Sequence, residues 1–142
     1  MILYFIRHGK SETYGTDMER PLTTEGKILL NEKFGRFKKI LEAKENIKIF
    51  TSPLKRARQT GEILSEILEK DFEISEEVYS MNIIPFLKTL EKNNDYIIIS
   101  HEPFISSWIR EIAGKFQIVS RGSIHIIEME EKFKGKSLRE FK

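Results

Sequence analysis

The chain has 142 residues, 39% of them hydrophobic and 32% charged, which predicts a single globular domain over residues 1–142 and argues against a disordered chain. Its 24 basic and 22 acidic side chains leave a formal net charge of +2, which gives no support for nucleic acid or a membrane surface as the main partner. Cysteine is absent, so disulfides, thiolate catalysis and cysteine-bound metals are excluded.

The apolar segments are too short for membrane insertion or export. No apolar run approaches the roughly 20 residues that span a bilayer. The apolar start, residues 1–6, is too short for a signal peptide and lacks a basic region before it. We therefore expect a cytoplasmic protein.

Short apolar runs alternate with helical patterns along the chain. Strands are predicted at residues 2–6, 47–50, 96–99 and 124–129, rich in isoleucine and aromatic residues. Helices are predicted at about 23–43, from Ser52-Pro53 onward, at 83–90 and from Pro103 onward. A glycine-containing connection after the last run predicts a final hairpin.

This alternation predicts the fold class. Strands joined by helical crossovers form a parallel sheet covered on both faces, and the final hairpin adds antiparallel pairing. We predict an α/β domain, a three-layer α/β/α sandwich with a mixed, mainly parallel central sheet. In such a sheet the ligand site lies at the carboxyl ends of the strands.

Four basic or titratable side chains follow three of the predicted strands. Arg7 and His8 end the first strand, Arg56 begins the helix after the second, and His101 follows the strand at 96–99. We expect the four to lie close together at one sheet edge. For each residue alone, a structural or solvated role is the simpler interpretation, and only their coincidence favours a site.

These residue types suit a phosphoryl group. Guanidinium groups bind phosphate oxygens bidentately and remain charged. Nearby cations favour the neutral imidazole, which is a competent nucleophile. His8, which lies beside Arg7, is a better candidate for the nucleophile than His101. No carboxylate cluster indicates a magnesium site, so we predict a site with no metal and no cofactor.

At these residues the chain resembles the histidine phosphatases, or phosphoglycerate mutase-like superfamily. The matching stretches are IRHG (residues 6–9), SPLKRARQT (52–60) and SHEP (100–103). The resemblance implies that His8 is phosphorylated during turnover, that Arg7, Arg56 and His101 form the phosphate pocket, and that the fold is phosphoglycerate mutase-like.

Within the superfamily, the short chain and the stretch ERPLTTEG (19–26) look most like the SixA-type phosphohistidine phosphatases. Full-length mutases carry additional residues that cap the substrate, which makes a mutase a poor match. Lys10 replaces the acidic residue of the commoner RHGE form and adds a cation near the predicted site.

The general acid is the least defined member of the predicted site. Relatives place a glutamate after the third strand, and Glu77 is the nearest match here, with Glu76 second. A phosphate ester expels an alkoxide that needs a proton, whereas phosphohistidine expels an imidazole, which leaves more readily. A weak or absent acid would therefore favour an N–P substrate.

The sequence thus predicts a metal-independent phosphatase that acts through a phosphohistidine intermediate. The preferred partner is a protein carrying phosphohistidine. Two alternatives remain open: a phosphatase of small phosphorylated metabolites, and a non-catalytic module that recognises phosphate. The sequence leaves the oligomeric state undetermined.

Overall fold

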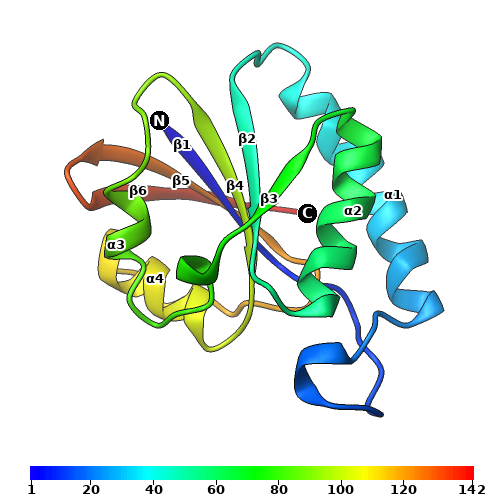
Figure 1. The fold of residues 1–142 in the computed structure, drawn as a ribbon. Coiled ribbons are helices and arrows are strands. Elements are labelled where there is room, and N and C mark those ends of the chain that lie inside the picture. Colours follow the sequence, from blue (N-terminus) through cyan, green and yellow to red (C-terminus); the bar gives the residue numbers. More distant parts are fainter.

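A six-stranded sheet with the order β3-β2-β4-β1-β5-β6 forms the centre of the molecule (Figure 1). The computed structural model describes all residues from 1 to 142. The strands are β1 (Ile2–Arg7), β2 (Ile47–Thr51), β3 (Phe72–Ile74), β4 (Asp95–Ser100), β5 (Ile124–Glu131) and β6 (Lys134–Phe141).

The strand directions confirm a mixed, mainly parallel sheet. β1 pairs in parallel with β4, β4 with β2, and β2 with β3. β5 runs antiparallel to both β1 and β6, which confirms the predicted final hairpin. β1 and β4 are the two central strands, and their carboxyl ends lie side by side.

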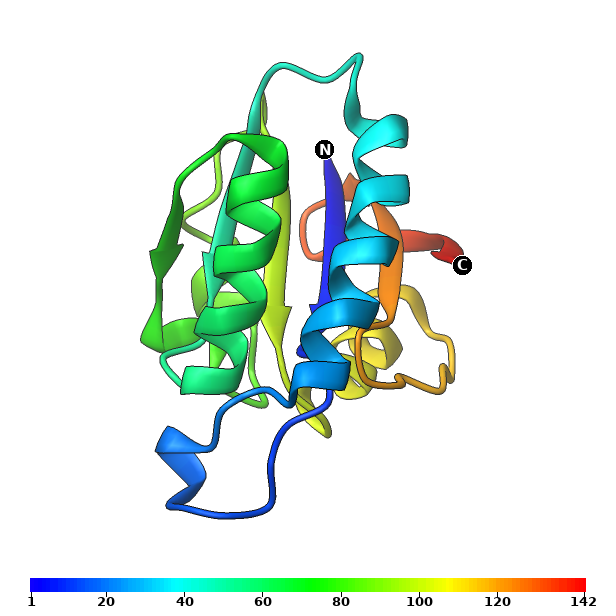
Figure 2. The same cartoon turned by 90° about the vertical axis from the view of Figure 1, so that its right-hand side faces the viewer.

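Helices cover both faces of the sheet. They are α1 (Thr24–Leu41), α2 (Lys55–Leu68), α3 (Ile84–Leu87) and α4 (Phe104–Ala113), with single 3-10 turns at η1 (Asp17–Glu19) and η2 (Glu76–Val78). Figure 2 shows α1 and α2 together on one face of the sheet, with α4 behind it. This arrangement confirms the three-layer α/β/α architecture.

The two faces of the sheet bury separate hydrophobic cores. Because side chains alternate along a strand, Tyr4 and Ile6 of β1 enter the core under α1 and α2. Leu3 and Phe5 enter the other core, where Trp108 of α4 is fully buried. Residues buried on both faces explain why the β1 run is almost continuously apolar.

Three elements differ from the sequence prediction. β3 was not predicted, because three residues are too few to show a period of two. α2 begins at Lys55 instead of Pro53, with Leu54 as the N-cap residue. α3 ends at Leu87 instead of residue 90; just beyond it, the hydroxyl of Thr89 donates to the carbonyl of Phe86.

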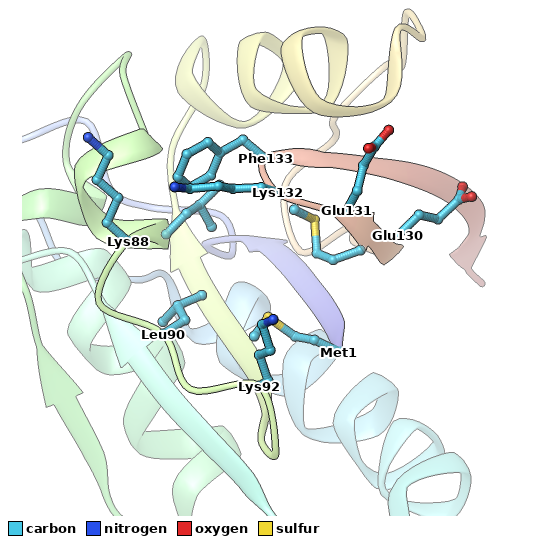
Figure 3. Close-up of a pocket in the computed structure, with 10 residues that line it drawn as sticks. Met1, Lys88, Leu90, Lys92, Glu130, Glu131, Lys132 and Phe133 are labelled. Atoms are coloured by element: carbon cyan, nitrogen blue, oxygen red, sulfur yellow. The ribbon is translucent and has the colours of Figure 1, made fainter.

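A cavity of about 620 Å³ lies at the amino end of β1, away from the predicted site (Figure 3). Met1, Leu90 and Phe133 line it together with lysine and glutamate side chains. None of the four residues of the predicted phosphate pocket does so. None of the helices has the length and apolar character that a membrane crossing requires.

Candidate active site

The structure brings Arg7, His8, Arg56 and His101 together at the carboxyl edge of the sheet. Arg7 pairs with Ser100 in the β1–β4 ladder, so the residues that follow these strands, His8 and His101, lie next to each other. Their ring centroids are 5.0 Å apart. Arg56 is the second residue of α2, the helix that follows β2. Its Nε lies 3.3 Å from Nε2 of His8.

The hydrogen bonds of His8 define which ring nitrogen is free to react. Nδ1 lies 2.7 Å from the carbonyl oxygen of Gly9, which can only accept a proton. Nε2 faces the Nε–H of Arg56, which can only donate. Both contacts fit the neutral tautomer with the proton on Nδ1 and the lone pair on Nε2.

The surroundings of His8 keep the ring uncharged. The pKa of His8 is lowered from 6.5 to about 4, mainly by burial. The positive charges of Arg56 and Arg7 contribute to this lowering, and the bond to Gly9 opposes it. The imidazole is therefore neutral at neutral pH, as a nucleophile requires.

His101, which follows β4, forms a hydrogen bond with a serine that follows the neighbouring strand β2. Oγ of Ser52, directly after β2, lies 2.5 Å from Nε2 of His101. Burial lowers the pKa of His101 to about 3, and the neighbouring His8 and Arg56 add to the effect. Its Nδ1 is buried and has no hydrogen-bond partner.

Arg7 joins the site to the loop that precedes β5. Its Nη1 donates to the carbonyl of Val119 at 2.9 Å, while its Nε is buried and has no partner. Arg7 Nε and His101 Nδ1 are the only two buried side-chain polar atoms without a partner. Unpaired buried polar atoms are costly, and two in one site point to a polar ligand between them.

An acidic residue that the sequence analysis did not identify already contacts Arg56. Asp17 of η1 accepts from Nη1 of Arg56 through its backbone carbonyl at 2.6 Å, and from Nη2 through Oδ1 at 3.3 Å. The same Oδ1 accepts from Arg20 at 2.9 Å, and this bond holds the pKa of Asp17 below its usual value. No motif marked Asp17, because its position depends on how the loop after β1 folds back.

The remaining predicted residues lie further out. Glu77 is exposed on η2 and forms no hydrogen bond or ion pair with the four site residues. Lys10 forms an ion pair with Glu25 of α1 at 2.9 Å. Tyr79, which the sequence did not predict, packs edge to face with His101, and the two ring centroids are 5.4 Å apart. No group of three or more His, Asp or Glu side chains is arranged to hold a metal ion.

Comparison with known families identifies the chain. Residues 3–84, more than half of the chain, match the family described as the histidine phosphatase superfamily (branch 1). The chain belongs to this superfamily. It is a histidine-type phosphatase with the phosphoglycerate mutase-like fold. The matched segment contains Arg7, His8 and Arg56, while His101 lies beyond it.

Individual relatives agree with this assignment. An uncharacterised protein of Picosynechococcus is 32% identical over 123 residues, covering 80% of this chain and 73% of that protein. The solved structure of the protein histidine phosphatase SixA complexed with tungstate has a TM-score of 0.88 at 22% identity, covering 99% of this chain and 96% of that one. The putative phosphohistidine phosphatase SixA of Agrobacterium tumefaciens has a TM-score of 0.81 at 13% identity, with 99% and 97% covered. These two likenesses show the shared fold.

Proposed function

We propose that this histidine phosphatase removes the phosphoryl group from protein phosphohistidine through a phospho-His8 intermediate, without a metal ion. The observation that carries the proposal is the pair of contacts that the two ring nitrogens of His8 make. Its Nδ1 is held by the Gly9 carbonyl and its Nε2 lone pair faces the cationic side chain of Arg56. A phosphorus atom held by Arg56 would therefore lie next to the free lone pair.

The proposed reaction has two steps. Nε2 of His8 attacks phosphorus, the P–N bond of the substrate breaks, and its electron pair leaves with the departing imidazole. Water then attacks the phosphoryl group on His8, the P–Nε2 bond breaks, and its electron pair returns to Nε2. Inorganic phosphate leaves with the protons of the water. The proton on Nδ1 stays bonded to the Gly9 carbonyl in the intermediate.

Arg7, Arg56 and His101 would stabilise the phosphoryl oxygens in both steps. The hydroxyl of Ser52 can donate to Nε2 of His101, which leaves the ring proton on the unpaired Nδ1. That N–H and the unpaired Nε–H of Arg7 would then donate to phosphoryl oxygens. These donors act where the transition state accumulates negative charge.

The substrate class follows from the leaving group. Phosphohistidine protonated on its second ring nitrogen releases a neutral imidazole and needs no proton from the enzyme. Glu77, the predicted acid, is exposed and unconnected to the site, which supports this class of substrate over alkyl phosphate esters. A role for Glu77 stays a prediction. The absence of cysteine fits a reducing cytoplasm, where we place the protein.

The test uses a phosphohistidine-bearing phosphocarrier protein with a chelator present, and phosphate release is followed over time. We expect release by the wild type and none by His8→Ala, and quenching in alkali should trap a base-stable, acid-labile phosphoenzyme only with His8 intact. Release that requires added metal would contradict the metal-free mechanism. Hydrolysis of small phosphate esters alone would favour a metabolite phosphatase, and no turnover of any substrate would favour a phosphate-recognition module.

A further inference from the structure

More than half of the exposed large apolar side chains lie on three loops that reach the carboxyl edge of the sheet. Eleven large hydrophobic residues are exposed on this molecule, and six of them lie on just three loops. The six are Tyr14, Met18, Tyr79, Met81, Phe116 and Ile118. The first two belong to the loop after β1, the next two follow η2, and the last two lie between α4 and β5. All three loops lie at the lower edge of the sheet in Figures 1 and 2.

The loop after β1 is tied to Arg56. Met18 is 52% exposed and directly follows Asp17, which accepts two hydrogen bonds from the guanidinium of Arg56. Tyr14, on the same loop, is also exposed. This loop therefore presents apolar side chains beside the phosphate-binding cation.

The other two loops are tied to Arg7 and His101 in the same way. Ile118 is 86% exposed and precedes Val119, whose carbonyl binds Arg7. Phe116 is exposed two residues earlier, with one ring face over the guanidinium of Arg110. The rings of Tyr79 and His101 pack edge to face, and Met81 follows two residues after Tyr79. Each loop thus contacts one site residue and carries two exposed apolar side chains.

We propose that these six side chains, here called the apolar collar, form the docking surface for a folded protein whose phosphohistidine is surrounded by apolar residues. The proposal rests on the proposed function and adds the partner surface to it. Exposed apolar clusters on a soluble protein mark interaction sites. Here each of the three loops contacts a residue of a cationic pocket, so one partner would supply both the phosphoryl group and the apolar area for the loops.

The chemistry of the collar separates this partner from a small metabolite. A small phosphorylated molecule is held by the central cations and gains little from side chains spread over three loops. A protein surface contacts all three loops at once, and burial of apolar area then adds to affinity. The collar would therefore act on binding of the phosphoprotein and leave the chemical step unchanged.

The experiment compares a Met18→Ser, Ile118→Ser double variant with the wild type and with Ile40→Ser. Ile40 is an exposed apolar residue near the end of α1, far from the site in sequence and structure, and serves as the matched control. Two quantities are measured: kcat/KM on free phosphohistidine, and the Kd of each form, carrying His8→Ala, for a phosphohistidine-bearing phosphocarrier protein. Because the Kd is measured on the inactive form, it does not depend on turnover.

We expect the double variant to bind the phosphocarrier about tenfold more weakly while its kcat/KM on free phosphohistidine stays within about twofold. Ile40→Ser should change neither quantity. An unchanged Kd in the double variant would overturn the collar proposal. The proposal would also be overturned if affinity for the phosphocarrier and kcat/KM on free phosphohistidine fell by the same factor. A wild type that releases no phosphate from the phosphocarrier would instead contradict the proposed function, whatever the Kd series shows.

Discussion

Among single residues, His8 and His101 show how burial and neighbouring cations set the chemistry of the site. Both rings are almost fully buried, and both have a pKa well below the usual histidine value. The same shift has a cost for folding, because an unfolded chain would let both rings take up protons at mildly acidic pH. The neutral rings that the proposed mechanism requires and the stability of the fold in acid therefore depend on the same two side chains.

Stability should fall as the pH drops from about 6.5 toward about 4, since in this window the unfolded state binds protons on His8 and His101 while the folded state does not. Chemical denaturation at a series of pH values measures this slope. We expect a shallower slope in His101→Asn, which removes one of the two titrating rings. Ring resonances that titrate near the usual histidine pKa in the folded protein would contradict the explanation.

Asp17 should compete with the phosphoryl group for Arg56. Its ionised carboxylate bonds the guanidinium and would repel a phosphate anion. Asp17→Asn is expected to tighten inorganic phosphate binding about two- to fivefold, the effect of one largely exposed charge pair. Inhibition constants for phosphate provide the measurement.

The matched control for Asp17 is Glu19→Gln. Glu19 lies on the same turn but contacts Arg58 at 3.9 Å and not Arg56, so its substitution should leave phosphate binding unchanged. Weaker phosphate binding in Asp17→Asn would show that Asp17 positions Arg56 and does not compete for it.

Among elements, the fit of α2 against β2 determines where the site residues lie. Gly61 of α2 faces the end of β2, and a Cβ there would lie 2.5 Å from Cγ2 of the fully buried Thr51. Thr51 directly precedes Ser52, which holds His101. The glycine therefore sets the helix–strand distance at the strand end that supports the site.

Gly61→Ala should push α2 away from Thr51 and destabilise the fold by about 1–3 kcal/mol, as overpacking in a tight core does. It should also lower kcat, because Ser52 and His101 move with the strand end. Denaturation and steady-state kinetics measure the two effects. Gly35→Ala is a suitable control, since no atom lies within 4 Å of a Cβ built there. Equal behaviour of the two variants would contradict the packing argument.

Elements with strong patterns could be predicted from the sequence, and those set by tertiary contacts could not. The runs of β1 and β4 are nearly all apolar and were found within a residue or so of their observed ends. The clustering of Arg7, His8, Arg56 and His101 could be predicted because strand ends and motifs mark them, and their catalytic roles stay a prediction. Asp17 and Tyr79 were missed, because only the folded loops bring them against Arg56 and His101.

In the whole molecule, one sheet separates two cores, and both must form for β1 and β4 to be covered on each face. The single tryptophan, Trp108, lies fully buried in the core beneath α4. The helical part of the far-ultraviolet circular dichroism signal, in contrast, comes largely from α1 and α2 on the opposite face of the sheet. Two spectroscopic probes thus report on opposite sides of the sheet.

We propose that the chain is one cooperative domain, and expect tryptophan fluorescence and far-ultraviolet circular dichroism to give coincident denaturation curves. Strands shared by both cores couple the two faces, so neither should unfold alone. Separate midpoints for the two probes would show that the faces unfold independently. Trp108→Phe, followed by circular dichroism alone, would check that the indole itself does not create the coupling.

The central position of β1 and β4 has a consequence for biosynthesis. His8 is made near the start of the chain, but its neighbour His101 comes late, and Arg7 also needs the carbonyl of Val119. A nascent chain on the ribosome therefore carries the nucleophile long before it can hold a phosphoryl group. Phosphatase activity should therefore first appear only once the chain through Val119 has emerged, because Arg7 and His101 cannot take their places before then.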